Sequence, residues 1–209
     1  RRANAPTSTS YSYCGNVDKS VVMYSLKGIP NISEELGIFR DIVIAEATGA
    51  HLHVCHVTAK GSVDIIRDAK KRGVNVTCEA APHHFTLSED DIKNCSPDYK
   101  MNPPLRTKKD VKAIIDGLKE NVIDIIATDH APHTAKEKSV GFAKAPFGII
   151  GLETALPLSL NLVHTKKISL SDLIYKMSTK PSEIININRG TLKVGSKADI
   201  VIFDINAKV

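Results

Sequence analysis

A carboxylate and two imidazoles come directly after a short apolar run in this chain. The apolar run spans residues 122–127, and Asp129, His130 and His133 follow it. An acid at the carboxyl end of a buried strand does not serve packing, and barrels and open α/β sheets place their chemistry at that end. A carboxylate beside imidazoles can bind a metal ion or transfer a proton. We therefore predict that Asp129 lies in a functional site.

A second candidate, His56, lies near the end of an apolar run at residues 51–57 that is expected to form a strand. Side chains alternate between the faces of a strand, so this pattern predicts His56 on the face opposite to His51 and His53. A lone histidine of this kind is more often a core residue than a ligand, and the residues by themselves leave both interpretations open. The His51-x-His53 pair lies early in the strand and is interpreted as structural.

A rigid turn is predicted at Asn102, which two prolines follow before Arg106. An amide held in such a turn could hydrogen-bond a substrate carbonyl, and the alternative interpretation is a plain loop. The sequence contains neither a glycine-rich phosphate loop nor a nucleophile elbow, so phosphoryl transfer and serine hydrolysis lose support.

The expected elements alternate between strands and helices, which favours βαβ units and a parallel sheet. Ser33 is predicted to cap the first helix and Gly49 to end it, and Thr107-x-x-Asp110 is predicted to open another. Strands are predicted at residues 51–57, 74–80 and 122–128, and helices at 33–47, 62–71, 107–119, 151–163, 171–177 and 181–187. Residues 190–204 are interpreted as a short, turn-rich β unit.

Composition indicates a globular protein. The 209 residues are 42% hydrophobic and 24% charged, with a formal net charge of +5. No apolar stretch approaches the roughly 20 residues of a membrane span, and the first residues do not form a secretory signal. The basic residues are scattered over helices, which indicates solvated faces rather than a nucleic-acid stripe, and the positive charge suits a small anionic substrate.

The four cysteines show no paired spacing typical of a metal or redox motif. Cys55 and Cys78 lie inside apolar runs and are predicted to be small core residues. This use of cysteine favours a reduced, cytoplasmic setting.

Six segments of the chain carry motifs that stand in one register: residues 53–58, 81–84, 99–106, 128–138, 144–148 and 195–199. Together they resemble the dihydroorotase family of the amidohydrolase superfamily, and the resemblance covers about residues 27 to 205. Hydantoinases and allantoinases share the Asp-His pair, but the Ala-Pro-His continuation and the run at 101–106 favour dihydroorotase.

The resemblance implies a TIM-like (β/α)8 barrel with a small β subdomain and a zinc centre, usually binuclear. It implies that His56, from the sixth strand, is a metal ligand, and that Asp129, ending the eighth, is both ligand and general acid–base. Four further positions would bind substrate: Asn102, His133, Phe147 and Gly148.

The reaction implied by the resemblance is the reversible cyclisation of N-carbamoyl-L-aspartate to dihydroorotate, a step of pyrimidine synthesis. Zinc would activate water and polarise the ring carbonyl, while Asp129 would carry the proton. The alternatives are a non-catalytic dihydroorotase-like scaffold subunit and another cyclic amidohydrolase, such as a hydantoinase or allantoinase. The expected partners are a small anionic substrate and either a second copy or another pyrimidine enzyme.

The sequence lacks the family's first-strand His-x-His, its bridging acid or lysine, and its fifth-strand histidine. A complete barrel takes about 250 residues, so we expect a carboxyl-terminal part with strands six to eight at residues 27–188. Residues 189–209 would belong to the β subdomain, and residues 1–26 are unassigned. One imidazole and one carboxylate do not complete a four-coordinate zinc site. We therefore expect this polypeptide, by itself, to be inactive and marginally folded.

Overall fold

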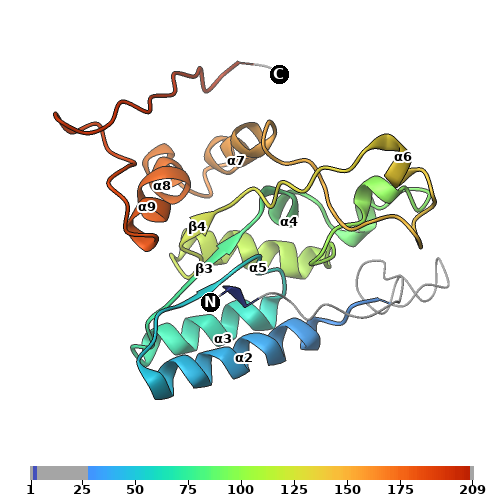
Figure 1. The fold of residues 1–209 in the computed structure, drawn as a ribbon, viewed down its shortest axis with the longest axis horizontal. Helices are drawn as coiled ribbons and strands as arrows, with labels where there is room; N and C mark the ends of the chain where they lie inside the picture. Colours follow the sequence, from blue (N-terminus) through green and yellow to red (C-terminus); the bar gives the residue numbers. More distant parts are fainter. Residues whose placement is uncertain (1, 4–27, 208–209) are drawn as a thin grey trace.

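A parallel β-sheet forms the centre of the protein. The structure, a computed structural model, describes residues 2–3 and 28–207, so nearly all of the unassigned segment 1–26 lies outside the described residues. Among the described residues, the sheet has four strands, which run in the order β1-β2-β3-β4 (Figure 1). They are β1 (Arg2–Ala3), β2 (Leu52–Val54), β3 (Val76–Ala80) and β4 (Ile125–Ile126). The predicted parallel sheet is confirmed, although each predicted strand is longer than the observed one.

Helices connect the successive strands, because parallel strands need a crossover connection. Figure 1 shows α2 and α3 side by side below the sheet, with α7, α8 and α9 grouped beyond β4. No helix among the described residues combines the length and the apolar character that crossing a membrane would need. The helices are α2 (Asn31–Thr48), α3 (Lys60–Lys71), α4 (Pro82–Thr86), α5 (Lys108–Lys119), α6 (Ala135–Lys138), α7 (Ala155–His164), α8 (Leu170–Ile174) and α9 (Lys180–Ile184), with a π-helical turn at Tyr175–Thr179.

Two of the predicted helix boundaries are confirmed and one is wrong. Thr107 and Asp110 form a capping box at the start of α5, and Gly49 ends α2 with a φ of 68°. Ser33 does not cap α2, because the helix already begins at Asn31. Pro30 occupies the N-cap position with an extended backbone, and its carbonyl accepts the Ser33 N–H at 3.0 Å.

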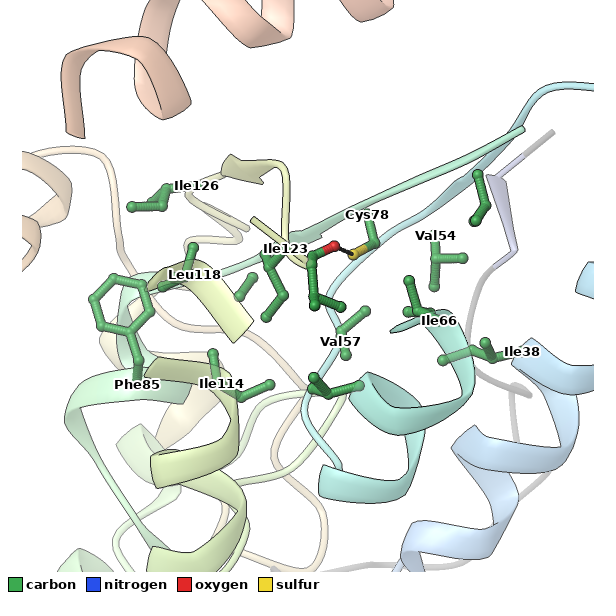
Figure 2. Packing of buried hydrophobic residues seen from close by; sticks show 14 of the residues in the cluster. Ile38, Val54, Val57, Ile66, Cys78, Phe85, Ile114, Leu118, Ile123 and Ile126 are labelled. Carbon is green, nitrogen blue, oxygen red and sulfur yellow. Dashed lines mark hydrogen bonds between the residues drawn. The ribbon is translucent and has the colours of Figure 1, made fainter. Parts of the chain in front are cut away.

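The hydrophobic core lies between the sheet and helices α2, α3 and α5. Figure 2 shows Val54, Ile66 and Ile114 converging in this layer. Cys78 is buried here, and its thiol donates to the carbonyl of Val122 at 3.2 Å. Burial raises the pKa of Cys78 to about 12, so the thiol stays protonated. The prediction that Cys78 is a core residue is confirmed.

The β unit predicted at residues 189–209 has no strand within residues 189–207, which is the part of it that the structure describes. Leu192, Val194 and Ile202 are 84%, 107% and 95% exposed. A strand needs a partner for its backbone N–H and C=O groups. The described residues offer no such partner here, so the segment remains turns and extended chain.

A buried ion pair ties α2 to the loops after β2 and before α5. The Glu34 carboxylate accepts the N–H groups of Thr58 and Ala59 at 2.9 and 3.0 Å, and Arg106 Nη2 at 3.4 Å. Arg106 Nε also donates to the Thr58 hydroxyl at 3.0 Å. Both charged side chains are buried. Arg106 therefore has a structural role, and it supports the loop that follows β2.

Substituting Glu34→Ala is expected to lower the free energy of unfolding by about 3–5 kcal/mol, because it leaves the Arg106 charge buried without its partner. The measurement is urea denaturation of a full-length relative in which this chain replaces the matching segment, with and without the substitution. Glu46→Ala is the matched control: Glu46 pairs with Arg72 at the surface, and such pairs contribute about 1 kcal/mol or less. Equal losses for the two variants would contradict the structural role of Glu34.

Candidate metal and catalytic site

The carboxyl ends of three neighbouring strands bring two histidines and two carboxylates together. His56 Nδ1 lies 2.9 Å from Glu79 Oε1, and His56 Nε2 lies 3.3 Å from Asp129 Oδ1. His53 Nε2 lies 3.1 Å from the other oxygen of Glu79. His56 follows β2, Glu79 belongs to β3 and Asp129 follows β4. The structure therefore brings together His56 and Asp129, the two residues singled out for chemistry.

The backbone turns sharply at both of these residues. His56 has a φ of 57° and Asp129 a φ of 47°, the left-handed region that residues other than glycine rarely adopt. Because β2 already ends at Val54, strand alternation no longer fixes the direction of His56. The prediction that His56 lies opposite His53 is wrong, since both histidines contact Glu79.

The two carboxylates differ in their electrostatic surroundings. Burial would raise the pKa of Glu79, but hydrogen bonds and charge interactions with His53 and His56 outweigh it and lower the pKa to about 2. Burial raises the pKa of Asp129, His56 opposes that shift, and the Glu79 charge adds to it. Glu79 is thus a fixed anion that orients imidazoles, whereas Asp129 is suited to accept and release a proton.

These side chains open onto a cavity of about 640 Å³. His51 and His53 lie on it too, and both approach the Thr77 hydroxyl, at 2.9 and 2.8 Å. Cys55 lines the cavity and is half-buried, so the prediction that it is a core residue is wrong. The lining residues are His51, His53, Cys55, His56, Glu79, Ile125, Ala127, Thr128, Asp129, His130, Pro181, Ile184 and Ile185.

Three of the four positions predicted to bind substrate lie together near a second cavity, of about 610 Å³. His133 and Gly148 line it, and His133 Nε2 lies 3.0 Å from the Phe147 carbonyl oxygen. Gly148 has a φ of 152°, and a Cβ there would approach the Ala131 oxygen to 2.3 Å, so only glycine fits. Asn102 is half-buried and lines neither of these two cavities.

Lys138 holds the loop that carries Phe147 and Gly148. Its ammonium donates to the carbonyls of Pro146 and Gly148 at 3.1 and 2.7 Å, and to those of Pro97 and Lys100 at 3.0 and 3.2 Å. Burial lowers the pKa of Lys138, and the charge of Asp98 opposes that shift. The ammonium therefore joins two loops around the second cavity.

Sequence reasoning did not single out Glu79 or Lys138. One feature of the sequence could have indicated Glu79: it is an acid among apolar residues of a predicted strand. A carboxylate buried in this way needs a partner, which points to a site. Lys138 had no local signal, since its four acceptors are backbone carbonyls of separate loops.

The fold and the site define the class of this protein. It is an α/β protein with histidines and carboxylates at the carboxyl ends of parallel strands. Within that class, the chain belongs to the amidohydrolase family. The sequence model described as "Amidohydrolase family" matches residues 17–209.

Curated relatives include two bacterial proteins named dihydroorotase. The one from Anoxybacillus flavithermus is 49% identical over 200 residues, which is 95% of this chain and 47% of the relative. The one from Trichlorobacter lovleyi is 55% identical over 179 residues, 86% of this chain and 42% of the relative. The chain thus spans less than half the length of these relatives.

Solved structures with a similar fold include two cyclic amide hydrolases. The L-hydantoinase (dihydropyrimidinase) from Arthrobacter aurescens matches with a TM-score of 0.76 and 32% identity, covering 81% of this chain and 39% of that structure. The dihydropyrimidinase from Brevibacillus agri matches with a TM-score of 0.78 and 28% identity, over the same shares.

Substituting Lys138→Met is expected to release the loop at residues 146–148, because four carbonyls lose their shared donor. Hydrogen exchange of the Gly148 amide, which donates to the Lys100 carbonyl at 2.9 Å, should become at least about tenfold faster, equivalent to roughly 1.4 kcal/mol. Lys136→Met, at an exposed position two residues away, is the control and should leave this exchange unchanged. Unchanged exchange in the Lys138 variant would contradict the proposed support.

Proposed function

We propose that this chain provides the proton-transfer residue and part of the metal site of a dihydroorotase, which interconverts N-carbamoyl-L-aspartate and dihydroorotate. One observation carries the proposal: His56 Nε2 and Asp129 Oδ1 lie 3.3 Å apart at neighbouring strand ends, while Glu79 faces the other ring nitrogen of His56. The family membership and the identity to proteins named dihydroorotase support the same reaction.

We further propose that the sheet belongs to a (β/α)8 barrel, with β2, β3 and β4 as its sixth, seventh and eighth strands. The sequential parallel order of these strands supports this, as does the clustering of polar side chains at their carboxyl ends. Residues 27–188 would form the barrel part and residues 189–209 a piece of the β subdomain. The exposed apolar residues of that tail would then pack against the rest of the subdomain.

The residues at the strand ends fit a zinc ion. His56 Nε2 and Asp129 would hold it, while Glu79 on Nδ1 would fix the ring and its tautomer, as carboxylates do behind metal-bound histidines. Bound zinc would supply activated water and a Lewis acid for the amide carbonyl. Because zinc takes four ligands, this pair needs others, and we expect the 209-residue chain by itself to be inactive.

In the hydrolytic direction, Asp129 accepts a proton from the attacking water. A C–O bond forms at the ring amide carbonyl, the ring C–N bond breaks, and Asp129 returns the proton to the departing nitrogen. Cyclisation reverses each of these transfers. The raised pKa of Asp129 suits a group that both accepts and releases a proton.

Substrate binding is proposed for His133 and the backbone at Phe147 and Gly148, which lie together. These groups would orient the small anionic substrate so that the reacting atoms meet. We also propose that the side-chain amide of Asn102 contacts the substrate, although Asn102 lines neither cavity. A second copy or another pyrimidine enzyme remains a proposed partner.

Two alternative functions have less support than the dihydroorotase reaction. A hydantoinase-type reaction is favoured by the structural matches, but at 32% and 28% identity these are more distant than the dihydroorotases at 49% and 55%. A non-catalytic scaffold subunit would be expected to have lost its ligands, whereas His56 and Asp129 are both present.

Replacing the matching segment of the Anoxybacillus flavithermus dihydroorotase with this chain tests the function. We expect the chimera to hydrolyse dihydroorotate in preference to hydantoin. Asp129→Asn should lower its kcat by about 10²–10⁴-fold, because the proton carrier is lost. Asp68→Asn, which alters a solvent-exposed carboxylate, is the control and should leave kcat unchanged. Preference for hydantoin would favour the hydantoinase alternative, and a folded but inactive chimera would favour the scaffold alternative.

Removing zinc from the same chimera with a chelator should abolish activity, and added zinc should restore it. Glu79→Gln should weaken zinc binding by about 10–100-fold, because the amide holds His56 less firmly. Zinc competition titration measures the affinity, and Glu120→Gln at an exposed position is the control. Unchanged zinc affinity in the Glu79 variant would refute the orienting role.

A further inference from the structure

Three different metal-ligating side chains lie together beside the His56–Asp129 pair. His53 belongs to β2, Cys55 follows β2 directly, and Glu79 belongs to the neighbouring strand β3. The strand register pairs His53 with Thr77 and Val54 with Cys78, so Cys55 and Glu79 each come one residue after the last registered pair. One ligand atom from each of His53, Cys55 and Glu79 lies within 4.8 Å of the other two.

The imidazole of His53 is already oriented for this cluster. Its Nδ1 lies 2.8 Å from the Thr77 hydroxyl, and its Nε2 is directed at Glu79 Oε2, 3.1 Å away. Thr77 therefore fixes the ring plane of His53, as outer-shell partners do for metal-bound histidines. Glu79 Oε2 is separate from Oε1, the oxygen that faces His56.

We propose that His53, Cys55 and Glu79 form a second cation site, specific for a soft divalent metal such as Cd²⁺ or Zn²⁺. A thiolate, an imidazole and a carboxylate together select such ions over Mg²⁺ or Ca²⁺, which prefer oxygen ligands. All three residues line the 640 Å³ cavity, so an ion can reach them. On binding, the thiol releases its proton to solvent, and His53 presents the lone pair of Nε2.

This site needs neither Asp129 nor His56 Nε2, so it goes beyond the proposed function and does not require it. The two positions share one residue, because each oxygen of Glu79 serves one of them. A metal at the second site would draw Oε2 away from His53 while Oε1 still faces His56.

The test is titration of the 209-residue chain with Cd²⁺, followed by the ultraviolet thiolate-to-cadmium charge-transfer absorption. We expect the absorption in the parent chain and its loss in Cys55→Ser, with Cys55→Ala as a second variant. His53→Gln should weaken Cd²⁺ binding by more than about tenfold, since loss of even an outer-shell partner can cost that much. Circular dichroism without Cd²⁺ checks that each variant keeps the parent's secondary structure.

Two controls separate this site from other thiols and from the catalytic proposal. Cys95→Ser removes another half-buried thiol, outside the cavity lining, and should leave the absorption intact. Asp129→Asn should also leave it intact, whereas it would lower the kcat of the chimera by about 10²–10⁴-fold. Absorption that persists in both Cys55 variants, or its absence from the parent chain, would overturn the second site while leaving the proposed function standing. Conversely, an inactive chimera would not affect the Cd²⁺ result.

Discussion

The carboxylate of Glu79 binds two imidazoles at once, and the geometry of the whole site follows from this. Its oxygens lie 2.9 Å from His56 and 3.1 Å from His53, and only 9% of the side chain is exposed. A carboxylate this buried is costly unless it is paired. The two histidines lower its pKa to about 2, so it stays ionised. The position of Glu79 depends in turn on the sheet, because neighbouring Cys78 packs into the core on the opposite face.

Sharp backbone turns directly after the strands place the side chains of the site. His56 and Asp129 both adopt left-handed conformations, which cost roughly 1–3 kcal/mol each and are concentrated at functional positions. These turns bring the two side chains to 3.3 Å from each other across the strand ends. The Glu34–Arg106 pair, which anchors the loop after β2 through Thr58, supports the turn at His56. Core packing, the Glu34–Arg106 ion pair and the two left-handed residues thus together position the side chains of His56 and Asp129.

The sequence predicted those features that local signals determine. Alternating apolar runs located the three strands, Thr107 and Asp110 located the start of α5, and an acid after an apolar run located Asp129. The face of His56 was mispredicted, because no local pattern shows that β2 ends at Val54 and that the chain then turns left-handed. Glu79 was missed since its partners come from the neighbouring strand, whose register a single sequence does not reveal. No strand forms within residues 189–207 for a similar reason, because alternation of apolar residues does not supply a pairing partner.

The central proposal is that His56 and Asp129 bind one metal ion, with Glu79 behind the imidazole. Anomalous diffraction at the zinc absorption edge, from crystals of the zinc-loaded chimera, tests this directly. We expect a zinc peak bonded to His56 through Nε2 and to the Asp129 carboxylate, with Nδ1 still facing Glu79. A zinc ion bonded to Nδ1 of His56, or one that Asp129 does not touch, would contradict it.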